Sequence, residues 1–483
     1  MLSSQFATRR NSGQALLRLA AAAISIFVLS TACHVYKPMP LDQEAVNRAL
    51  TPPSDQTIRQ EAAAINHPIL RPIVFDDRDG LSPDEAAVLA VLANPSLRAE
   101  RDRRGLADAA LLEAGLLPNP QLSAGLDIPT GGITKGAING YTLGLSWDIS
   151  ALISRTARVR SSQAERKSVD LDVAWQEWQT AEAAKLSVYK LLVLEQKLTK
   201  AREMDDNQAQ LVELLRKALA QGQSTAPEVG AAASIAQQAH LTRLQLEQEI
   251  DKERNQLLRL LGLPAGTEIR LQEGVTIPTR LLPPPADDLL AGLEDRRLDL
   301  VALRQGYESQ EQTLRAACLD QFPKVGIEVG QARDTGDVIT TGPAVTIDLP
   351  LFNRNQGQIA TAKATRQQLF DEYTGRVAEA RADVALLLSE ADILNRQIES
   401  SVDADASLSG LADTYRAALN SGQTDRLTYL EAMNAVDEKE QEVLTLQGQL
   451  LETRIALEIA TGRYQIEAEN EYQVPAGAGE VKP

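Results

Sequence analysis

The sequence predicts a mainly α protein with a small β part, built from one unit that occurs twice. The first observation is a strand that leads into a long helical region, since residues 345–349 alternate apolar and polar side chains before Pro350. Asn353 is the predicted N-cap of the helix that follows. The second is that the same order of segments surrounds Asp148 and Asp348, which are 200 positions apart. The third is composition: aromatic residues make up only 4% of the chain, and small or helix-forming residues dominate its middle. Long helices packed through small side chains follow from this composition.

The N-terminus has the pattern of a secretion signal. Three arginines precede an apolar run over residues 19–29, and small residues then lead to Cys33. The run is too short to span a bilayer. A signal that ends at a cysteine resembles that of bacterial lipoproteins, although Ser30 stands where leucine is usual. This resemblance implies that residues 1–32 are removed and that Cys33 carries the lipid, palmitate included. An ordinary signal peptidase site beside an uninvolved cysteine is the alternative.

A proline-rich arm separates the signal from the first repeat. Its prolines prevent long regular structure over residues 33–80. The first repeat, residues 81–263, opens with a helix that is expected to begin at Pro83. Ser82 is its predicted N-cap, and Glu85 completes a capping box.

Two strands and a long αα-hairpin complete the first repeat. The strands are expected over residues 120–128 and 141–149, where apolar residues alternate with polar ones. Between Ser146 and Gln221 the chain has neither Gly nor Pro, and apolar residues recur at steps of three and four. This pattern predicts a very long helix with a coiled-coil-like seam. Gly222 ends that helix, so the tip of the hairpin lies near residue 222 and a returning helix follows.

The second repeat, residues 287–465, has the same order of segments and follows a linker over residues 264–286. Its predicted segments are a helix over 289–320, strands over 323–332 and 343–350, and a hairpin with its tip near residue 422. Residues 466–483 are expected to form a flexible tail.

The four predicted strands favour a membrane-inserted assembly of several chains. No stretch after residue 33 has the roughly 18 apolar residues that a membrane helix needs. Four strands alone leave two open edges, which a bilayer does not tolerate, so several chains would have to close a barrel together. Apolar faces would then point to lipid. The residues expected to face water are Ser123, Asp127, Thr142, Asp148, Glu328 and Asp348.

This organisation is similar to the outer membrane factor family, the TolC-like channels of tripartite efflux and type I secretion. The resemblance covers residues 81–465 and is carried by Leu-Pro-Asn-Pro at 117–120, by Asp-Leu-Pro-Leu-Phe-Asn-Arg-Asn-Gln-Gly at 348–357, and by two glycine-centred turns. It implies a homotrimer with a twelve-stranded outer-membrane β-barrel that continues into a periplasmic α-barrel. Residues 33–38 resemble the start of the lipoprotein branch.

The resemblance also implies where partners bind. In that family the hairpin tips meet a periplasmic adaptor, and an inner-membrane pump, here of the resistance-nodulation-division type, drives transport. The implied adaptor-contact residues are Gln221, Gly222, Gln223, Ser421, Gly422 and Gln423. Because the residues beside the glycines are polar here, the contact should be more polar than is usual. The implied tunnel constriction involves Glu228, Thr428 and Glu431, and the threonine replaces an acid of the family pattern.

The predicted function is that of an outer-membrane exit duct that passes drugs or metal ions to the exterior. A type I secretion channel, or a periplasmic adaptor or structural lipoprotein, is the alternative. A net charge of −17 without a basic patch disfavours nucleic acid as a partner. The three histidines are scattered, so no metal or cofactor site and no enzyme activity is expected. Ser187-Val-Tyr-Lys190 matches a penicillin-recognising pattern, but its companion motifs are absent.

Overall fold

The computed structural model describes residues 36–76, 78–132 and 135–463. The predicted signal peptide, Cys33 and the tail over 466–483 lie outside these residues, so their roles stay predictions. The chain divides into a unit that ends at Thr51 and a second unit that begins at Pro52. The first unit contains helix α2 (Gln43–Leu50), whose N-terminus is capped by the side chain of Asp42.

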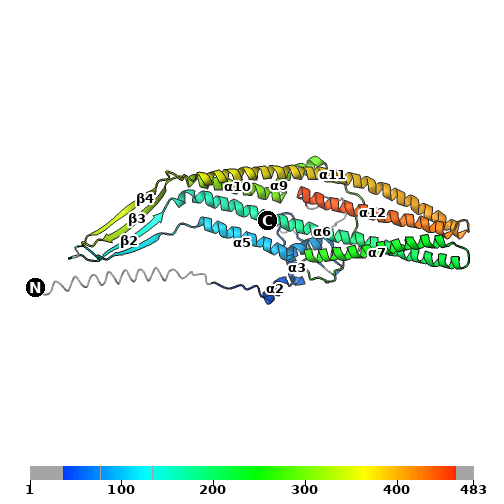
Figure 1. Cartoon of the computed structure of the whole chain (residues 1–483). Helices are drawn as coiled ribbons and strands as arrows, with labels where there is room; N and C mark the ends of the chain where they lie inside the picture. The colour runs from blue at the N-terminus through cyan, green and yellow to red at the C-terminus, as the bar shows by residue number, and fades with distance from the viewer. Residues whose placement is uncertain (1–35, 77, 133–134, 464–483) are drawn as a thin grey trace. The chain divides into compact units, whose positions relative to one another are not determined.

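The second unit shows the predicted duplication (Figure 1). Its first half contains α3 (Asp55–Ala63), α4 (Pro83–Ala93), α5 (Pro95–Gly115), β1 (Gln121–Asp127), β2 (Gly140–Asp148), α6 (Ala151–Ala220) and α7 (Ala226–Leu260). Its second half contains α8 (Ala286–Leu290), α9 (Leu293–Arg296), α10 (Leu298–Leu319), β3 (Lys324–Arg333), β4 (Ile339–Asp348), α11 (Gln356–Asn420) and α12 (Arg426–Thr461). Each half therefore supplies two strands and one long αα-hairpin.

Helix α4 begins where its local sequence signal places it. The predicted capping box at α4 is confirmed, because Ser82 Oγ accepts from Glu85 N–H at 3.2 Å and Glu85 Oε2 accepts from Ser82 N–H at 2.9 Å. Helix α6 has 70 residues. At 1.5 Å per residue its length is about 105 Å.

The four strands form one antiparallel sheet in chain order, β1-β2-β3-β4. Strands β2 and β3 come from different halves, so their pairing joins the two copies of the unit. The pairing runs from Tyr141 opposite Arg333 to Asp148 opposite Gly326. Strands β1 and β4 are the edges of this sheet within one chain.

The helical core is built around α6, which packs against α4, α5, α7, α10 and α12. One cluster centres on Trp175 and Trp178 of α6 and also contains Leu70 and Leu298. A second cluster joins α4 and α7 to the middle of α6, with Leu191 and Leu257 fully buried. Alanines line much of both seams, as the composition predicts.

Three details of the sequence prediction were wrong. The helix expected over 289–320 is split into α8, α9 and α10: Gly292, with a left-handed φ of 66°, separates α8 from α9, and Arg297, with an extended backbone, separates α9 from α10. Strand β4 begins four residues before the predicted start and contains Pro343, which an edge strand tolerates. Helix α11 has Asn355 at its N-cap position, with a φ of 60°, where Asn353 is the residue that the sequence favours as a cap.

Candidate functional site

The two hairpin tips share one backbone geometry. Gly222 and Gly422 have φ angles of 73° and 74°. Just beyond each glycine, Gln223 N–H donates to the Ala218 carbonyl and Gln423 N–H donates to the Ala418 carbonyl, both at 2.8 Å. A Cβ on either glycine would meet no atom within 4 Å. Glycine is therefore needed here for its backbone angle and not for space.

The residues at both tips are exposed to solvent. This holds for all six predicted adaptor-contact residues, which are Gln221, Gly222, Gln223, Ser421, Gly422 and Gln423. Their side chains offer amide and hydroxyl groups, and Leu219 just before the first tip is 38% exposed. The structure thus presents a mainly polar surface at each tip.

The predicted constriction residues have local roles in starting the returning helices. Glu228 Oε2 accepts from Ser224 Oγ at 2.7 Å and from Thr225 N–H at 2.8 Å, and these hydrogen bonds lower the pKa of Glu228. Thr428 donates to Asp425 Oδ1 through both its N–H and its hydroxyl, each at 2.8 Å. Glu431 lies exposed on the next turn of α12. A constriction formed by these residues between chains stays a prediction.

The sheet separates polar from apolar side chains across all four strands. The register sets Ser123 opposite Gly144, Gly144 opposite Gly330, and Gly330 opposite Gly342. Because paired residues share a face and faces alternate along a strand, one face carries every side chain predicted to meet water. These are Ser123, Asp127, Thr142, Asp148, Glu328 and Asp348.

The opposite face of the sheet is apolar over most of its length and uncovered within one chain, with Gln331, Arg333 and Thr341 at one end. Its exposed side chains range from 38% for Leu143 to 76% for Leu122. They are Leu122, Leu126, Leu143, Leu145, Ile327, Val329, Val345 and Ile347. An exposed apolar face of this kind marks a surface that another molecule or a lipid phase covers.

The row of glycines across the polar face was not anticipated from the sequence. A Cβ on Gly144 would lie 2.6 Å from Glu328 Oε1 and 2.7 Å from Ser123 Oγ, so the glutamate side chain lies directly over this glycine. The signal was present, since Gly144, Gly330 and Gly342 all fall on the polar positions of their strands. Only the register could show that they align.

A ladder of polar contacts joins α6 of the first hairpin to α12 of the second. It was not predicted from the sequence. Its members are Lys190 with Glu452 at 2.8 Å, Lys197 with Thr445 at 3.0 Å, Lys200 with Glu440 at 2.8 Å, and Gln208 with Asn434. Asp437 lies beside this ladder, 7% exposed, and burial followed by the charge of Glu440 raises its pKa to about 6. The seam between the hairpins therefore carries polar contacts along this stretch, whereas α11 and α12 of the second hairpin meet through an apolar cluster that includes Ile398 and Leu450.

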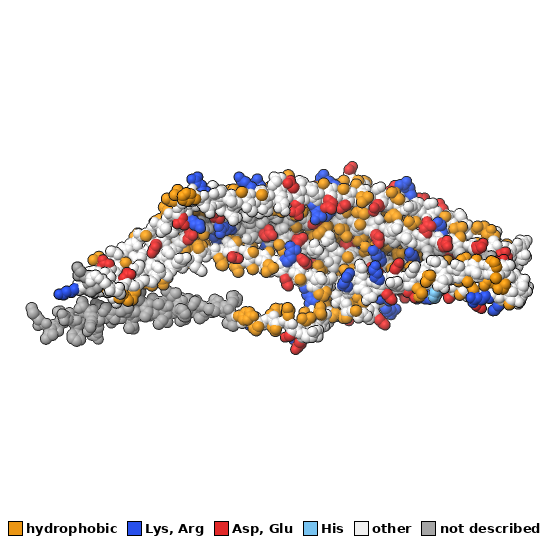
Figure 2. Space-filling model, in the orientation of Figure 1, with side chains coloured by type: hydrophobic (Ala, Val, Ile, Leu, Met, Phe, Trp, Pro, Cys, Tyr) orange, Lys and Arg blue, Asp and Glu red, His pale blue; other side chains and the backbone are white. Residues whose placement is uncertain are grey.

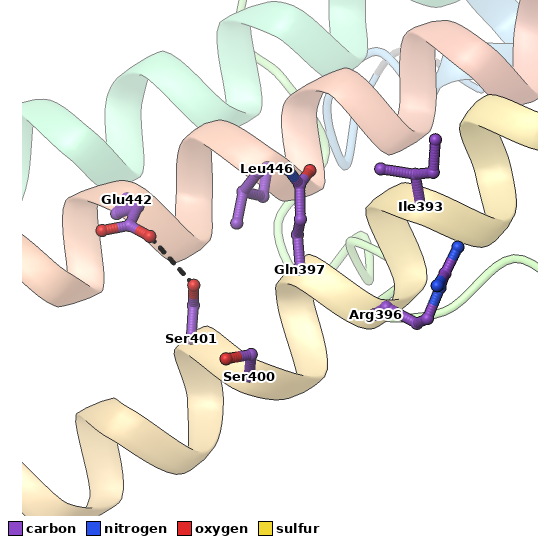
Figure 3. A pocket seen from close by; sticks show the side chains of 7 residues that line it. All are labelled: Ile393, Arg396, Gln397, Ser400, Ser401, Glu442 and Leu446. Atoms are coloured by element: carbon purple, nitrogen blue, oxygen red, sulfur yellow. Dashed lines mark hydrogen bonds between the residues drawn. The ribbon is translucent and has the colours of Figure 1, made fainter.

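A groove between α11 and α12 has no catalytic arrangement (Figure 3). Ser401 Oγ donates to Glu442 Oε1 at 2.9 Å, and Lys439 Nζ lies 2.6 Å from Glu442 Oε2, so this carboxylate bridges the two helices. The Ser187 and Lys190 side chains of the penicillin-recognising pattern bind Glu253 and Glu452 respectively.

Other classes of site find little support in the part of the chain that the structure describes. There, no group of three or more His, Cys, Asp or Glu side chains is placed to hold a metal ion. Within the same residues, no helix is both long and apolar enough to cross a membrane. Acidic and basic side chains alternate along the helices on the face shown in Figure 2, without a continuous basic patch.

The second half of the chain resembles outer membrane efflux proteins. Residues 289–463 match the family model described as "Outer membrane efflux protein", which confirms the predicted family. Among curated relatives, the cobalt-zinc-cadmium resistance protein CzcC of Cupriavidus metallidurans is 21% identical over 360 residues, which cover 74% of this chain and 83% of the relative.

Solved structures confirm the predicted fold class. The outer membrane protein VceC of Vibrio cholerae is similar with a TM-score of 0.64 and 20% identity, and the match covers 79% of this chain and 96% of VceC. The outer-membrane channel OprN is similar with a TM-score of 0.68 and 17% identity, over 89% of this chain and 99% of OprN. At these identities the likeness establishes the architecture.

Proposed function

We propose that this chain is the outer-membrane exit duct of a tripartite efflux system. It is an outer membrane efflux protein with a large helical part, which is periplasmic in this proposal. The observation that carries the proposal is the duplicated unit itself: a two-faced strand pair that continues into a long αα-hairpin, twice, within a chain of this family. Such a duct needs no catalysis, because the inner-membrane pump supplies the energy.

The proposed assembly is a homotrimer. Strands β1 and β4 each have an unpaired edge within one chain, and the apolar face of the sheet is exposed. Exposed strand edges pair readily with further strands. Three copies joined edge to edge would close the twelve strands, with the polar face turned toward the water-filled path and the apolar face toward lipid.

The hairpin tips are the proposed docking site for the adaptor. Gly222 and Gly422 leave both tips free of side chains at the point of closest approach. The amide and hydroxyl groups beside them favour an adaptor whose own tip is polar. A pump of the resistance-nodulation-division type and lipid attachment at Cys33 complete the proposal.

The proposal is tested in a deletion strain complemented with the wild-type gene. Because the relative CzcC is named for cobalt, zinc and cadmium resistance, these ions are assayed first, followed by a panel of drugs. The expected result is higher sensitivity in the deletion strain and recovery on complementation, with the protein in the outer-membrane fraction. Unchanged sensitivity together with loss of a secreted protein would favour type I secretion instead.

A further inference from the structure

In the segment between α3 and α4, one buried histidine joins the turn over residues 67–70 to α6. His67 is 4% exposed at its side chain. The N–H groups of Ile69 and Leu70 both donate to its Nδ1, at 3.1 and 3.0 Å. Its Nε2 lies 2.9 Å from the carbonyl oxygen of Ala174 in α6. Since two donors point at Nδ1, that nitrogen carries no hydrogen, and Nε2–H donates to Ala174.

This hydrogen bonding defines the protonation state on which the contact depends. A proton on Nδ1 would face two N–H groups that cannot accept it, so both hydrogen bonds would be lost. Neutral imidazole therefore folds the segment into a turn and fixes that turn to α6. Histidine is the side chain whose unperturbed pKa places this change within the range of ordinary environmental pH.

The charged groups that face His67 come from two helices. On α6, Glu177 Oε2 lies 3.8 Å from His67 Nε2 and favours the imidazolium. On α5, Arg101 and Arg104 pair with that same carboxylate at 2.5 and 3.4 Å and offset its effect. Burial is the largest influence, and it lowers the pKa of His67 below its usual value.

The turn at His67 also positions apolar side chains. Leu70, three residues on and 3% exposed, packs into the cluster that holds Trp175 and Trp178. Of the three tryptophans in the chain, only Trp147 on β2 lies outside this cluster. A loosened turn would therefore change the surroundings of two tryptophans.

We propose that His67 is a pH-sensitive latch, which in its neutral form holds the turn over residues 67–70 on α6 and on protonation at Nδ1 releases it. The latch acts independently of what the channel carries. The direction of the pH effect follows from the lowered pKa of His67 in the closed state. Closure is favoured above pH 6.5 and weakens as the pH falls from 6.5 toward that lowered pKa.

The test is hydrogen exchange at Ile69 and Leu70 in the full chain, purified in detergent and followed by mass spectrometry. After correction for the intrinsic exchange rate, opening should increase between pH 7.5 and 5, approaching about 30-fold if only the open state binds the proton. Tryptophan emission, measured in parallel, should shift over the same range. An unchanged opening equilibrium in the wild type would overturn the proposal.

Variants separate the latch from general acid effects. His67→Asn keeps a side-chain acceptor for the two N–H groups but cannot titrate, so its opening should not depend on pH. His240→Asn alters a histidine that binds Asp205 elsewhere, and should behave like the wild type. Glu177→Gln removes an anion that favours imidazolium in the closed state, so its acid-induced opening should be at least as large as that of the wild type, up to the same limit of about 30-fold. An acid-induced opening that persists in His67→Asn, or that becomes smaller in Glu177→Gln, would contradict the latch.

Discussion

Lys200 Nζ lies 2.8 Å from Glu440 Oε2, and this ion pair joins α6 of the first hairpin to α12 of the second. Lys200 also faces Asp437 and Glu203, so one cation balances several acids. Replacing Lys200 with Met should therefore destabilise the folded protein by about 1 kcal/mol, since its side chain is partly exposed. Thermal unfolding in detergent measures this, and adding Glu440→Gln should restore part of the loss. A Lys200→Met protein as stable as the wild type would show that the pair contributes nothing.

Asp437 should make the stability of the same seam depend on pH. Its pKa is raised to about 6, above the usual 3.8, so its contribution to stability is complete below 3.8 and is lost as the pH rises through about 6. Asp437→Asn should be more stable than the wild type at pH 7.5, and the difference should shrink by pH 5. Melting temperatures at three pH values test this. A difference that does not vary with pH would assign the effect to something other than titration.

The tips offer a test of docking against folding. Gly222→Val with Gly422→Val places β-branched side chains at left-handed φ, at a cost of about 1–2 kcal/mol per site. The proposed outer-membrane trimer should persist, because the tips are exposed, while resistance should be lost because the proposed adaptor can no longer approach. Trimer level and resistance are measured in the same strain. Full resistance would show that these glycines serve only to end the helices. Absence of the trimer would show that they are needed for folding.

Two glycines of the sheet form a matched pair for mutation. A Cβ on Gly140 would lie 2.6 Å from the carbonyl oxygen of Arg333, a backbone atom that cannot move aside without disturbing the β2–β3 pairing. A Cβ on Gly342 would meet nothing within 4 Å. Gly140→Ala should lower the yield of heat-modifiable outer-membrane species, and Gly342→Ala should match the wild type. Equal yields would show that the β2–β3 register adapts.

Lipid attachment is tested at Cys33. Cys33→Ala should abolish palmitate labelling and leave an unprocessed precursor, because the lipoprotein signal ends at this residue. Gel migration and metabolic labelling measure both effects. Equal labelling of the wild type and the variant would show that Cys33 is not the site of lipid attachment.

Period-two and period-three-to-four patterns were sufficient to predict the strands, the long hairpins and both tips, because each segment is two-faced or unbroken by Gly and Pro. The same patterns could not reveal contacts between distant segments. Lys200 and Glu440 look like ordinary solvated charges in the sequence, and only the antiparallel approach of α6 and α12 brings them together. The break at Gly292 was missed because a single glycine inside an apolar pattern is compatible with a continuous helix.

A polar ladder joins Lys190–Gln208 of α6 to α12. The heat-capacity change on parting the two hairpins there should therefore differ from that of parting an apolar seam. Separating them there would hydrate amines, carboxylates and amides, and such groups add little or negatively to the heat capacity. Parting an apolar seam within a hairpin would instead raise the heat capacity. The enthalpy of moving α12 away from α6 along the ladder should thus vary little with temperature, and the free energy should vary strongly with ionic strength.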